Sequence, residues 1–263
     1  MEFKKTILGF FSRILRILGI IALLYVSMVF YLALTERRNA YPRAISHNEA
    51  RAAIQDFAKS ISCTLGDGTI LNGFIAGDKN TPLLLYYPDA DEDGAQFIAE
   101  VQNIPDVALV TFNYRGSADN KGTPEHKTFE PDAKEIWECA TQISGTQPAF
   151  AVGRGTGAIL AAEQGDAKTK FILIDPVLSI AQAISAKYRI LYPKFLIRAP
   201  EQLPLETLSK YLNNVHIVLD RKFVEERAQQ VVQKLPTAQV EARNGNSLQQ
   251  TLTKVIQKSH TND

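Results

Sequence analysis

The most apolar stretch of the chain runs from Ile17 to Leu34 and contains no charged residue. A helix needs about 20 such residues to cross a hydrocarbon layer about 30 Å thick. A cleavable signal peptide has a shorter apolar region, of about 7–15 residues. The pattern therefore predicts an uncleaved, membrane-spanning signal-anchor within residues 1–39. Paired arginines lie on both sides of the span: Arg13 and Arg16 before it, Arg37 and Arg38 after it.

Beyond the span, residues 40–59 have the pattern of a tether and a short helix that begins near His47 or Asn48. Two alternating segments around Gly66-Asp67-Gly68 then predict a β-hairpin. Strands that alternate with helices form βαβ units, so residues 60–263 are expected to be one α/β domain with a mainly parallel sheet. Its buried strands are predicted at Pro82–Tyr87, Val107–Asn113, Phe150–Val152, Phe171–Ile174 and Val215–Leu219. Its helices include Ala95–Asn103 and Pro131–Ile143, the latter with Asp132 and Glu135 near its start, where acidic residues favour the helix dipole.

Charge is distributed unevenly along the chain. Residues 1–43 hold seven of the 29 basic residues and two of the 28 acidic ones, so the remainder is mildly acidic. An acidic body argues against nucleic acid as a partner. The basic residues around the apolar span favour a cytoplasmic N-terminus. The body is then expected on the extracytoplasmic side, which is the periplasm if the membrane is a bacterial inner membrane.

Cysteine and histidine give no sign of a metal or another cofactor. Cys63 and Cys139 make neither a disulfide framework nor a metal-ligand pattern, and we expect free thiols. The four histidines are isolated from one another. His126 is expected to be solvated in a loop, and His216 lies inside a predicted strand.

The segment Phe150–Glu163 joins a predicted strand to a small-residue helix through a Gly-x-Gly-x-Gly turn. A tight turn explains these glycines sufficiently. A phosphate cradle at the helix N-terminus is the alternative. It is weaker, because the turn lacks the third glycine of a dinucleotide-binding fingerprint at its spacing and comes late in the chain.

With these elements placed, the chain resembles the α/β-hydrolase superfamily, and within it the BEM46-like membrane-anchored hydrolases. The most specific similarity is carried by Asn113-Tyr114-Arg115-Gly116-Ser117, by Gly122-Thr123-Pro124-Glu125 and by Asp132-Ala133. The resemblance covers about residues 60–258. It implies an α/β-hydrolase fold: a mainly parallel sheet with an N-terminal β-hairpin, helices on both faces and a minimal cap, preceded here by one transmembrane helix.

The resemblance also implies where a catalytic triad would lie. Gly155 takes the position of the nucleophilic serine in the family's Gly-x-Ser-x-Gly elbow. After Val215–Leu219, Arg221 or Lys222 falls nearest the acid, and Asp220 remains as a fallback acid. Asn246 takes the place of the histidine base, and an amide cannot accept a proton at neutral pH.

The oxyanion region departs from the family as well. Tyr87-Pro88-Asp89 replaces its His-Gly segment, and Arg154 and Thr156 flank the elbow glycine. Pro88 removes a backbone donor, and the Asp89 carboxylate would repel an oxyanion. The acidic cluster Asp89, Asp91, Glu92 and Asp93 is predicted to be a solvated loop rather than a calcium site.

These substitutions predict a membrane-tethered, catalytically inactive hydrolase-like protein that acts as a binding or scaffolding module. A pocket beneath Gly155, widened by the missing side chain, could hold a small acyl or lipid-like ligand, and a protein partner is the other option. The alternative is an active serine/threonine-type hydrolase with Thr156 as a relocated nucleophile. A purely structural role in an envelope complex is a third option. Further candidate hydroxyls for the alternative are Ser117, Ser179 and Ser247.

Overall fold

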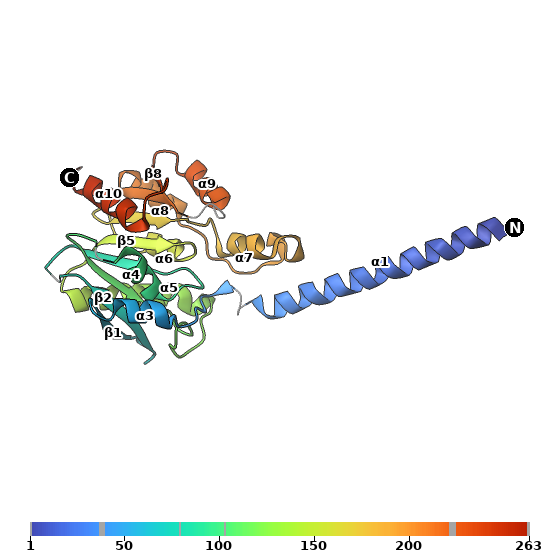
Figure 1. The fold of residues 1–263 in the computed structure, drawn as a ribbon, viewed down its shortest axis with the longest axis horizontal. Coiled ribbons are helices and arrows are strands. Elements are labelled where there is room, and N and C mark those ends of the chain that lie inside the picture. Colours follow the sequence, from blue (N-terminus) through green and yellow to red (C-terminus); the bar gives the residue numbers. More distant parts are fainter. Residues whose placement is uncertain (1, 37–39, 79, 103, 221–224, 262–263) are drawn as a thin grey trace.

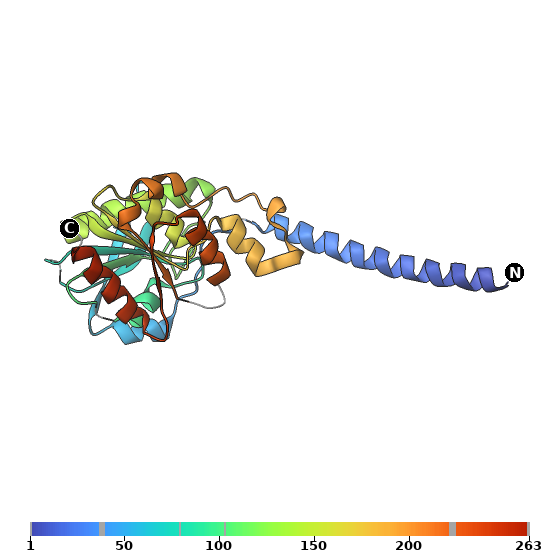
Figure 2. The ribbon, with the colours of Figure 1, turned by 90° about the horizontal axis from the view of Figure 1, so that it is seen from above.

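A long helix and a compact body make up the molecule. The computed structural model describes residues 2–36, 40–78, 80–102, 104–220 and 225–261. Helix α1 (Glu2–Leu34) extends away from the body in both views (Figures 1 and 2). Its segment Gly9–Leu34 is long and apolar enough to cross a membrane, and its side chains are almost entirely exposed. The predicted apolar helix is therefore confirmed, and burial in a protein core does not explain it.

Among the described residues, eight strands form one sheet in the order β1-β2-β4-β3-β5-β6-β7-β8. The β1–β2 and β2–β4 pairs are antiparallel, and all other neighbours are parallel. The predicted hairpin and the mainly parallel sheet are thus confirmed. The strands are β1 (Ala58–Thr64), β2 (Ile70–Ala76), β3 (Leu83–Tyr87), β4 (Ala108–Phe112), β5 (Pro148–Arg154), β6 (Lys170–Ile174), β7 (Val215–Leu219) and β8 (Gln239–Ala242).

Helices cover both faces of the sheet and form two separate apolar cores. One core combines alternate strand residues such as Leu83 and Leu85 with α5 (His126–Ser144), α6 (Gly157–Glu163), α7 (Ile180–Tyr188), α8 (Leu205–Lys210) and α9 (Glu225–Lys234). The opposite core combines the intervening residues, such as Leu84, with α3 (Asn48–Ile54), α4 (Gly94–Val101) and α10 (Leu248–Thr261). Burial on both faces explains the continuous apolar runs of the central strands. The described residues also include three short 3₁₀ helices: η1 (Arg189–Leu191), η2 (Lys194–Leu196) and η3 (Leu212–Asn214).

Helix α5 begins earlier than predicted. It starts at His126 instead of Pro131, because Glu125 and Thr128 form a reciprocal capping box. Asp132 therefore lies in the helix interior, and its expected place near the helix start is wrong. Its carboxylate instead binds Arg115 through two hydrogen bonds, of 2.6 and 2.7 Å.

The two cysteines are not free. Cys63 in β1 and Cys139 in α5 form a disulfide between residues 76 positions apart, with their Cα atoms 5.8 Å apart. The expectation of free thiols is wrong because a hairpin strand and a distant helix pack side by side. No sequence spacing reveals such a pairing.

The segment between α1 and α3 lies against the body. Tyr41 is buried, packs edge-on against Phe129, and donates a 2.6 Å hydrogen bond to Glu201. Ala44 accepts a backbone hydrogen bond from Ala118. The predicted tether is therefore attached to the body at several points.

Candidate functional site

The Gly-x-Gly-x-Gly turn joins β5 to α6 at the carboxyl end of the central strands. Gly155 has φ +55°, a left-handed conformation that favours glycine. A Cβ at Gly153 would collide with the backbone of Gly157 and Ala158, and one at Gly157 with the carbonyl groups of Tyr87 and Pro88. The outer glycines therefore allow the helix to pack closely on the strands, and the central one makes the turn.

The carboxylate of Asp89 occupies the space where a side chain on residue 155 would begin. A Cβ at Gly155 would come within 3.0 Å of three Asp89 carboxylate atoms, closer than real Cβ atoms approach. Asp89 Oδ1 accepts hydrogen bonds from the Thr156 backbone N–H (3.0 Å) and the Thr156 hydroxyl (2.9 Å). The expected wider pocket beneath Gly155 is therefore wrong. The cavity there has only about 40 Å³ and is lined by Asp89, Arg154, Gly155, Asp175, Val177, Ala183 and Arg227.

Arg154, at the end of β5, is the centre of a buried charge network. Its side chain is only 2% exposed, and its guanidinium lies 2.6 Å from Glu92, 2.8 Å from Glu100 and 3.5 Å from Asp220. It also lies over the Phe97 ring, 5.7 Å from the centroid. Three carboxylates thus surround one buried cation beneath the elbow.

Glu92 connects this network to the loop after β3. It accepts hydrogen bonds from the Tyr86 hydroxyl (2.6 Å) and from the Asp89 backbone N–H (3.0 Å). Burial raises the pKa of Glu92, although Arg154 and Tyr86 act in the opposite direction. The Asp89 N–H that could point into the site therefore already has an acceptor.

The acidic loop is not the solvated loop that its composition predicts. Asp91 is exposed, but Glu92 and Asp93 are buried. Asp93 accepts from Ala95 N–H and caps α4, and it also pairs with Arg51 at 2.9 Å. Glu92 is paired with Arg154, and Asp93 is paired with Arg51 and with the start of α4. The two arginines are distant in the sequence, so local composition does not predict this burial. Within the described ranges, no group of acidic, histidine or cysteine residues could hold a metal ion.

The positions assigned to the acid and the base lie in two neighbouring loops. Asp220, with a side chain 1% exposed, pairs with Arg243 at 2.7 Å and with Arg154. Asn246 is exposed, and its backbone carbonyl accepts a hydrogen bond from Arg243 Nε at 2.6 Å. Arg243 thus joins the Asn246 loop to Asp220, and Arg154 joins Asp220 to the elbow. Arg221 and Lys222 lie outside the described residues.

The other candidate hydroxyls have structural partners. Ser117 accepts from Ala44 N–H, and Ser179 and Ser247 accept from the first turns of α7 and α10. His126 is exposed, as expected, but it begins α5 instead of lying in a loop, and its Nδ1 lies 2.9 Å from the buried Glu201. His216 is a core residue beside Ser259, and burial lowers its pKa to about 4. Within the described part of the chain, Thr156 has Asp89 as its side-chain partner instead of a histidine.

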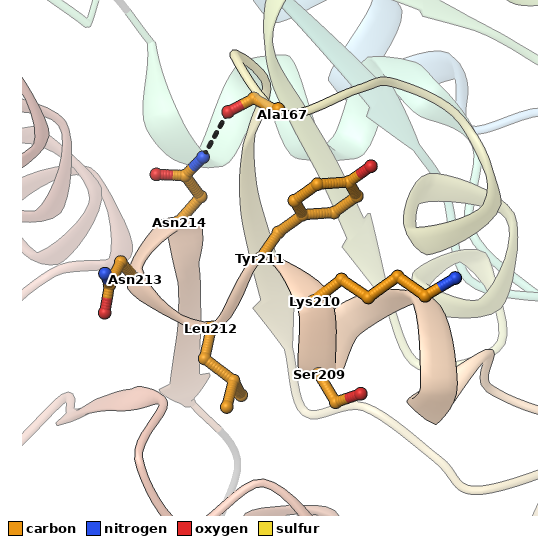
Figure 3. A pocket seen from close by; sticks show the side chains of 7 residues that line it. All are labelled: Ala167, Ser209, Lys210, Tyr211, Leu212, Asn213 and Asn214. Carbon is orange, nitrogen blue, oxygen red and sulfur yellow. Dashed lines mark hydrogen bonds between the residues drawn. The ribbon is translucent and has the colours of Figure 1, made fainter.

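A larger hollow, of about 410 Å³, lies away from the elbow (Figure 3). It surrounds the start of β7, at the amino end of the parallel strands, and Asn214 donates a 2.7 Å hydrogen bond to the Ala167 carbonyl there. Ser209 and Tyr211 carry its hydroxyl groups and Lys210 is its cation, without a histidine or carboxylate among the lining residues. Because it lacks an acid–base pair, we assign the candidate site to the smaller cavity at the elbow.

Solved structures with a similar fold are known. An α/β-hydrolase of Vibrio vulnificus superposes with a TM-score of 0.58 at 14% identity, over 84% of this chain and 95% of the other. An esterase of Pyrococcus furiosus gives 0.59 at 12% identity, over 84% and 97%. A proline iminopeptidase-related protein of Thermus thermophilus gives 0.56 at 14% identity, over 77% and 96%.

This chain has the α/β-hydrolase fold. No family model matches the sequence, and no curated protein matches it. At these identities the similarity establishes the fold alone, and the expected fold class is confirmed.

The small cap of this α/β-hydrolase fold comprises α7, η1 and η2, between β6 and α8. It lies beside the body-proximal end of α1 in both views (Figures 1 and 2). Glu36, just after α1, accepts from the Tyr192 hydroxyl at 2.7 Å and from the backbone N–H of Arg198 and Ala199. Burial and the Glu36 carboxylate raise the pKa of Tyr192, which keeps its hydroxyl a donor.

Proposed function

We propose that this protein is a membrane-tethered, catalytically inactive α/β-hydrolase-like module that acts through its surfaces. The observation that carries this proposal is the Asp89 carboxylate, which fills the side-chain space at Gly155 and binds Thr156 N–H. The cavity left beside it, of about 40 Å³, holds little more than one water molecule. We therefore do not propose an acyl ligand at this position. We propose instead that the protein binds through a surface elsewhere on the body.

Acyl transfer needs a nucleophile, a base and donors for the oxyanion. In this fold the nucleophile is the central residue of the elbow, and the next backbone N–H is an oxyanion donor. Here that position is Gly155, and the next N–H, of Thr156, donates to a carboxylate. The Asp89 N–H donates to Glu92. Asn246, at the proposed base position, is exposed and cannot accept a proton at neutral pH.

One observation favours a second candidate function. The Thr156 hydroxyl lies 2.9 Å from Asp89 Oδ1, within the distance at which a carboxylate can take up a proton. The fold neighbours include an esterase. A threonine-type hydrolase with Asp89 as base and Asp220 as a further acid is therefore the alternative.

Labelling and turnover separate the two functions. We expect the full-length protein to react with a fluorophosphonate probe, and to hydrolyse p-nitrophenyl esters, no faster than its Thr156→Ala variant. The reason is that both candidate oxyanion donors, the backbone N–H groups of Thr156 and Asp89, already donate to carboxylates. Hydrolysis that Thr156→Ala removes and the matched variant Ser247→Ala retains would establish the alternative. Circular dichroism of each variant controls for folding.

We further propose that α1 anchors the chain with its body on the extracytoplasmic side. The supports are the charge-free run within Gly9–Leu34, the basic residues around it, and the Cys63–Cys139 disulfide. Disulfides persist in oxidising compartments and are rare in the cytosol. In this proposal residues 1–39 form the anchor, 40–59 the connection and 60–263 the body.

The disulfide gives a direct test of sidedness. When free thiols are blocked at lysis, we expect mass spectrometry to find Cys63 and Cys139 linked and unmodified by the blocking reagent. A Val240→Cys variant adds an exposed thiol on β8, which a membrane-impermeant maleimide should label from outside. The opposite result would place the body in the cytoplasm: Cys63 and Cys139 would both carry the blocking reagent, and the cysteine at position 240 would be labelled only after lysis.

A further inference from the structure

The tip of the cap has an unusual surface for a soluble body. Between Ile180 and Pro200 the sequence has no acidic residue and four basic ones: Lys187, Arg189, Lys194 and Arg198. All four are exposed. Among them lie three exposed apolar side chains, Ile190 (79%), Leu191 (42%) and Phe195 (84%). The other large apolar side chains exposed on the described body are scattered singly, as on ordinary protein surfaces.

The cap tip lies against the helix proposed to cross the membrane. Tyr25 in α1 donates a hydrogen bond of 3.2 Å to the carbonyl of Ile190. Tyr25 is nine residues before Leu34, so it lies about 13 Å along the helix from the end of the apolar run. If α1 crosses a membrane, η1 therefore lies at the same depth in the lipid leaflet as Tyr25.

The attachment of the cap to α1 is more than one hydrogen bond. Glu36 binds the Tyr192 hydroxyl and two backbone N–H groups on the far side of η2. Leu32 in α1 is buried in the same apolar core as Tyr192. The depth of α1 in a bilayer thus determines the depth of the cap tip.

We infer that residues 187–198 form a membrane-inserting patch, with Ile190, Leu191 and Phe195 in the leaflet nearest the body and the four basic side chains on anionic headgroups. This inference rests on the proposed membrane crossing by α1. Apolar side chains rimmed by lysine and arginine are the composition of interfacial membrane-binding segments. Long basic side chains reach the headgroups while their stems stay in the apolar layer. The patch fixes the orientation of the body on an anionic membrane surface.

Depth-dependent quenching tests this patch in the full-length protein. Single cysteines at Phe195→Cys, Val240→Cys and Val26→Cys are added to the chain, whose native cysteines remain paired, and carry an environment-sensitive fluorophore. Each protein is reconstituted into vesicles of phosphatidylglycerol with brominated phosphatidylcholine. We expect the emission at position 195 to fall by about half and that at Val240, an exposed apolar control on β8, to stay unchanged.

The three probe positions separate failure of the patch from failure of the anchor. Quenching of the probe at position 26 in α1, without quenching of the probes at positions 195 and 240, would overturn the patch and leave the membrane helix. An unquenched probe at position 26 would overturn the anchor and the patch together. Exchanging phosphatidylglycerol for a neutral lipid should reduce quenching at 195 and not at 26, and equal quenching at 195 in both lipids would overturn the headgroup contacts.

Discussion

Gly155→Ala is expected to lower the free energy of unfolding by about 4 kcal/mol. Two effects add. A residue with a Cβ at φ +55° costs about 1–3 kcal/mol in backbone strain. Its Cβ would also collide with the Asp89 carboxylate, which two hydrogen bonds to Thr156 hold in place, and such overpacking costs about 1–3 kcal/mol. Urea denaturation of the two proteins measures the difference.

Gly145→Ala is the matched control for the backbone effect. Gly145 also has a positive φ, +78°, but a Cβ there would have no atom within 4 Å. We expect this variant to lose about 1 kcal/mol, from the left-handed conformation alone. Equal losses in both variants would show that the space beside Gly155 is free.

The second large effect is expected for Arg154→Met, at about 3–5 kcal/mol. The substitution keeps an unbranched, flexible side chain but removes the charge that neutralises Glu92 and Asp220, whose side chains are 6% and 1% exposed. A buried carboxylate without its cation is strongly destabilising. Arg243→Met is the control, because Arg243 is 37% exposed and is expected to contribute only about 1 kcal/mol.

The deficit of Arg154→Met should grow with pH. Burial already raises the pKa of Glu92, and loss of the guanidinium raises it further. A raised pKa means that the folded state holds the proton more tightly than the unfolded chain. The stabilisation from this tighter proton binding is complete below the usual glutamate pKa, and it is lost as the pH rises through the pKa of Glu92 in the folded state. Unfolding measured at pH 5 and pH 8 should therefore show the smaller deficit at about pH 5. A deficit that does not change with pH would contradict a buried, charge-dependent network.

The sheet is the part of the structure that local sequence predicts well. Continuous apolar runs such as Leu83–Tyr87 and Val215–Leu219 are strands because both faces of the sheet are covered. The sequence pattern does not predict the short strand β8, because Gln239 and Glu241 interrupt its apolar residues. The start of α5 differs from the one that Pro131 predicts, because a capping box at Glu125 begins the helix earlier.

Long-range pairings explain what the sequence could not show. Glu92 in the acidic loop is neutralised by Arg154, 62 residues later, and Cys63 is bonded to Cys139, 76 residues later. Patterns of neighbouring residues therefore cannot reveal either pair. The missing hydroxyl at Gly155 could be predicted from the motif. The carboxylate that fills its place could not, because it depends on how the loop after β3 packs against the β5–α6 turn and on the rotamer of Asp89 there.

A double-mutant cycle between Asp89→Ala and Gly155→Ala tests most directly whether the Asp89 carboxylate replaces the elbow side chain. Asp89→Ala alone should cost about 1–2 kcal/mol, because Thr156 loses its acceptor. With the carboxylate gone, the Cβ at residue 155 has room, so the double variant should be about 2 kcal/mol more stable than the sum of the single losses predicts. Losses that add to within about 0.5 kcal/mol would show that Asp89 and the side-chain space of residue 155 are independent, and would contradict this account.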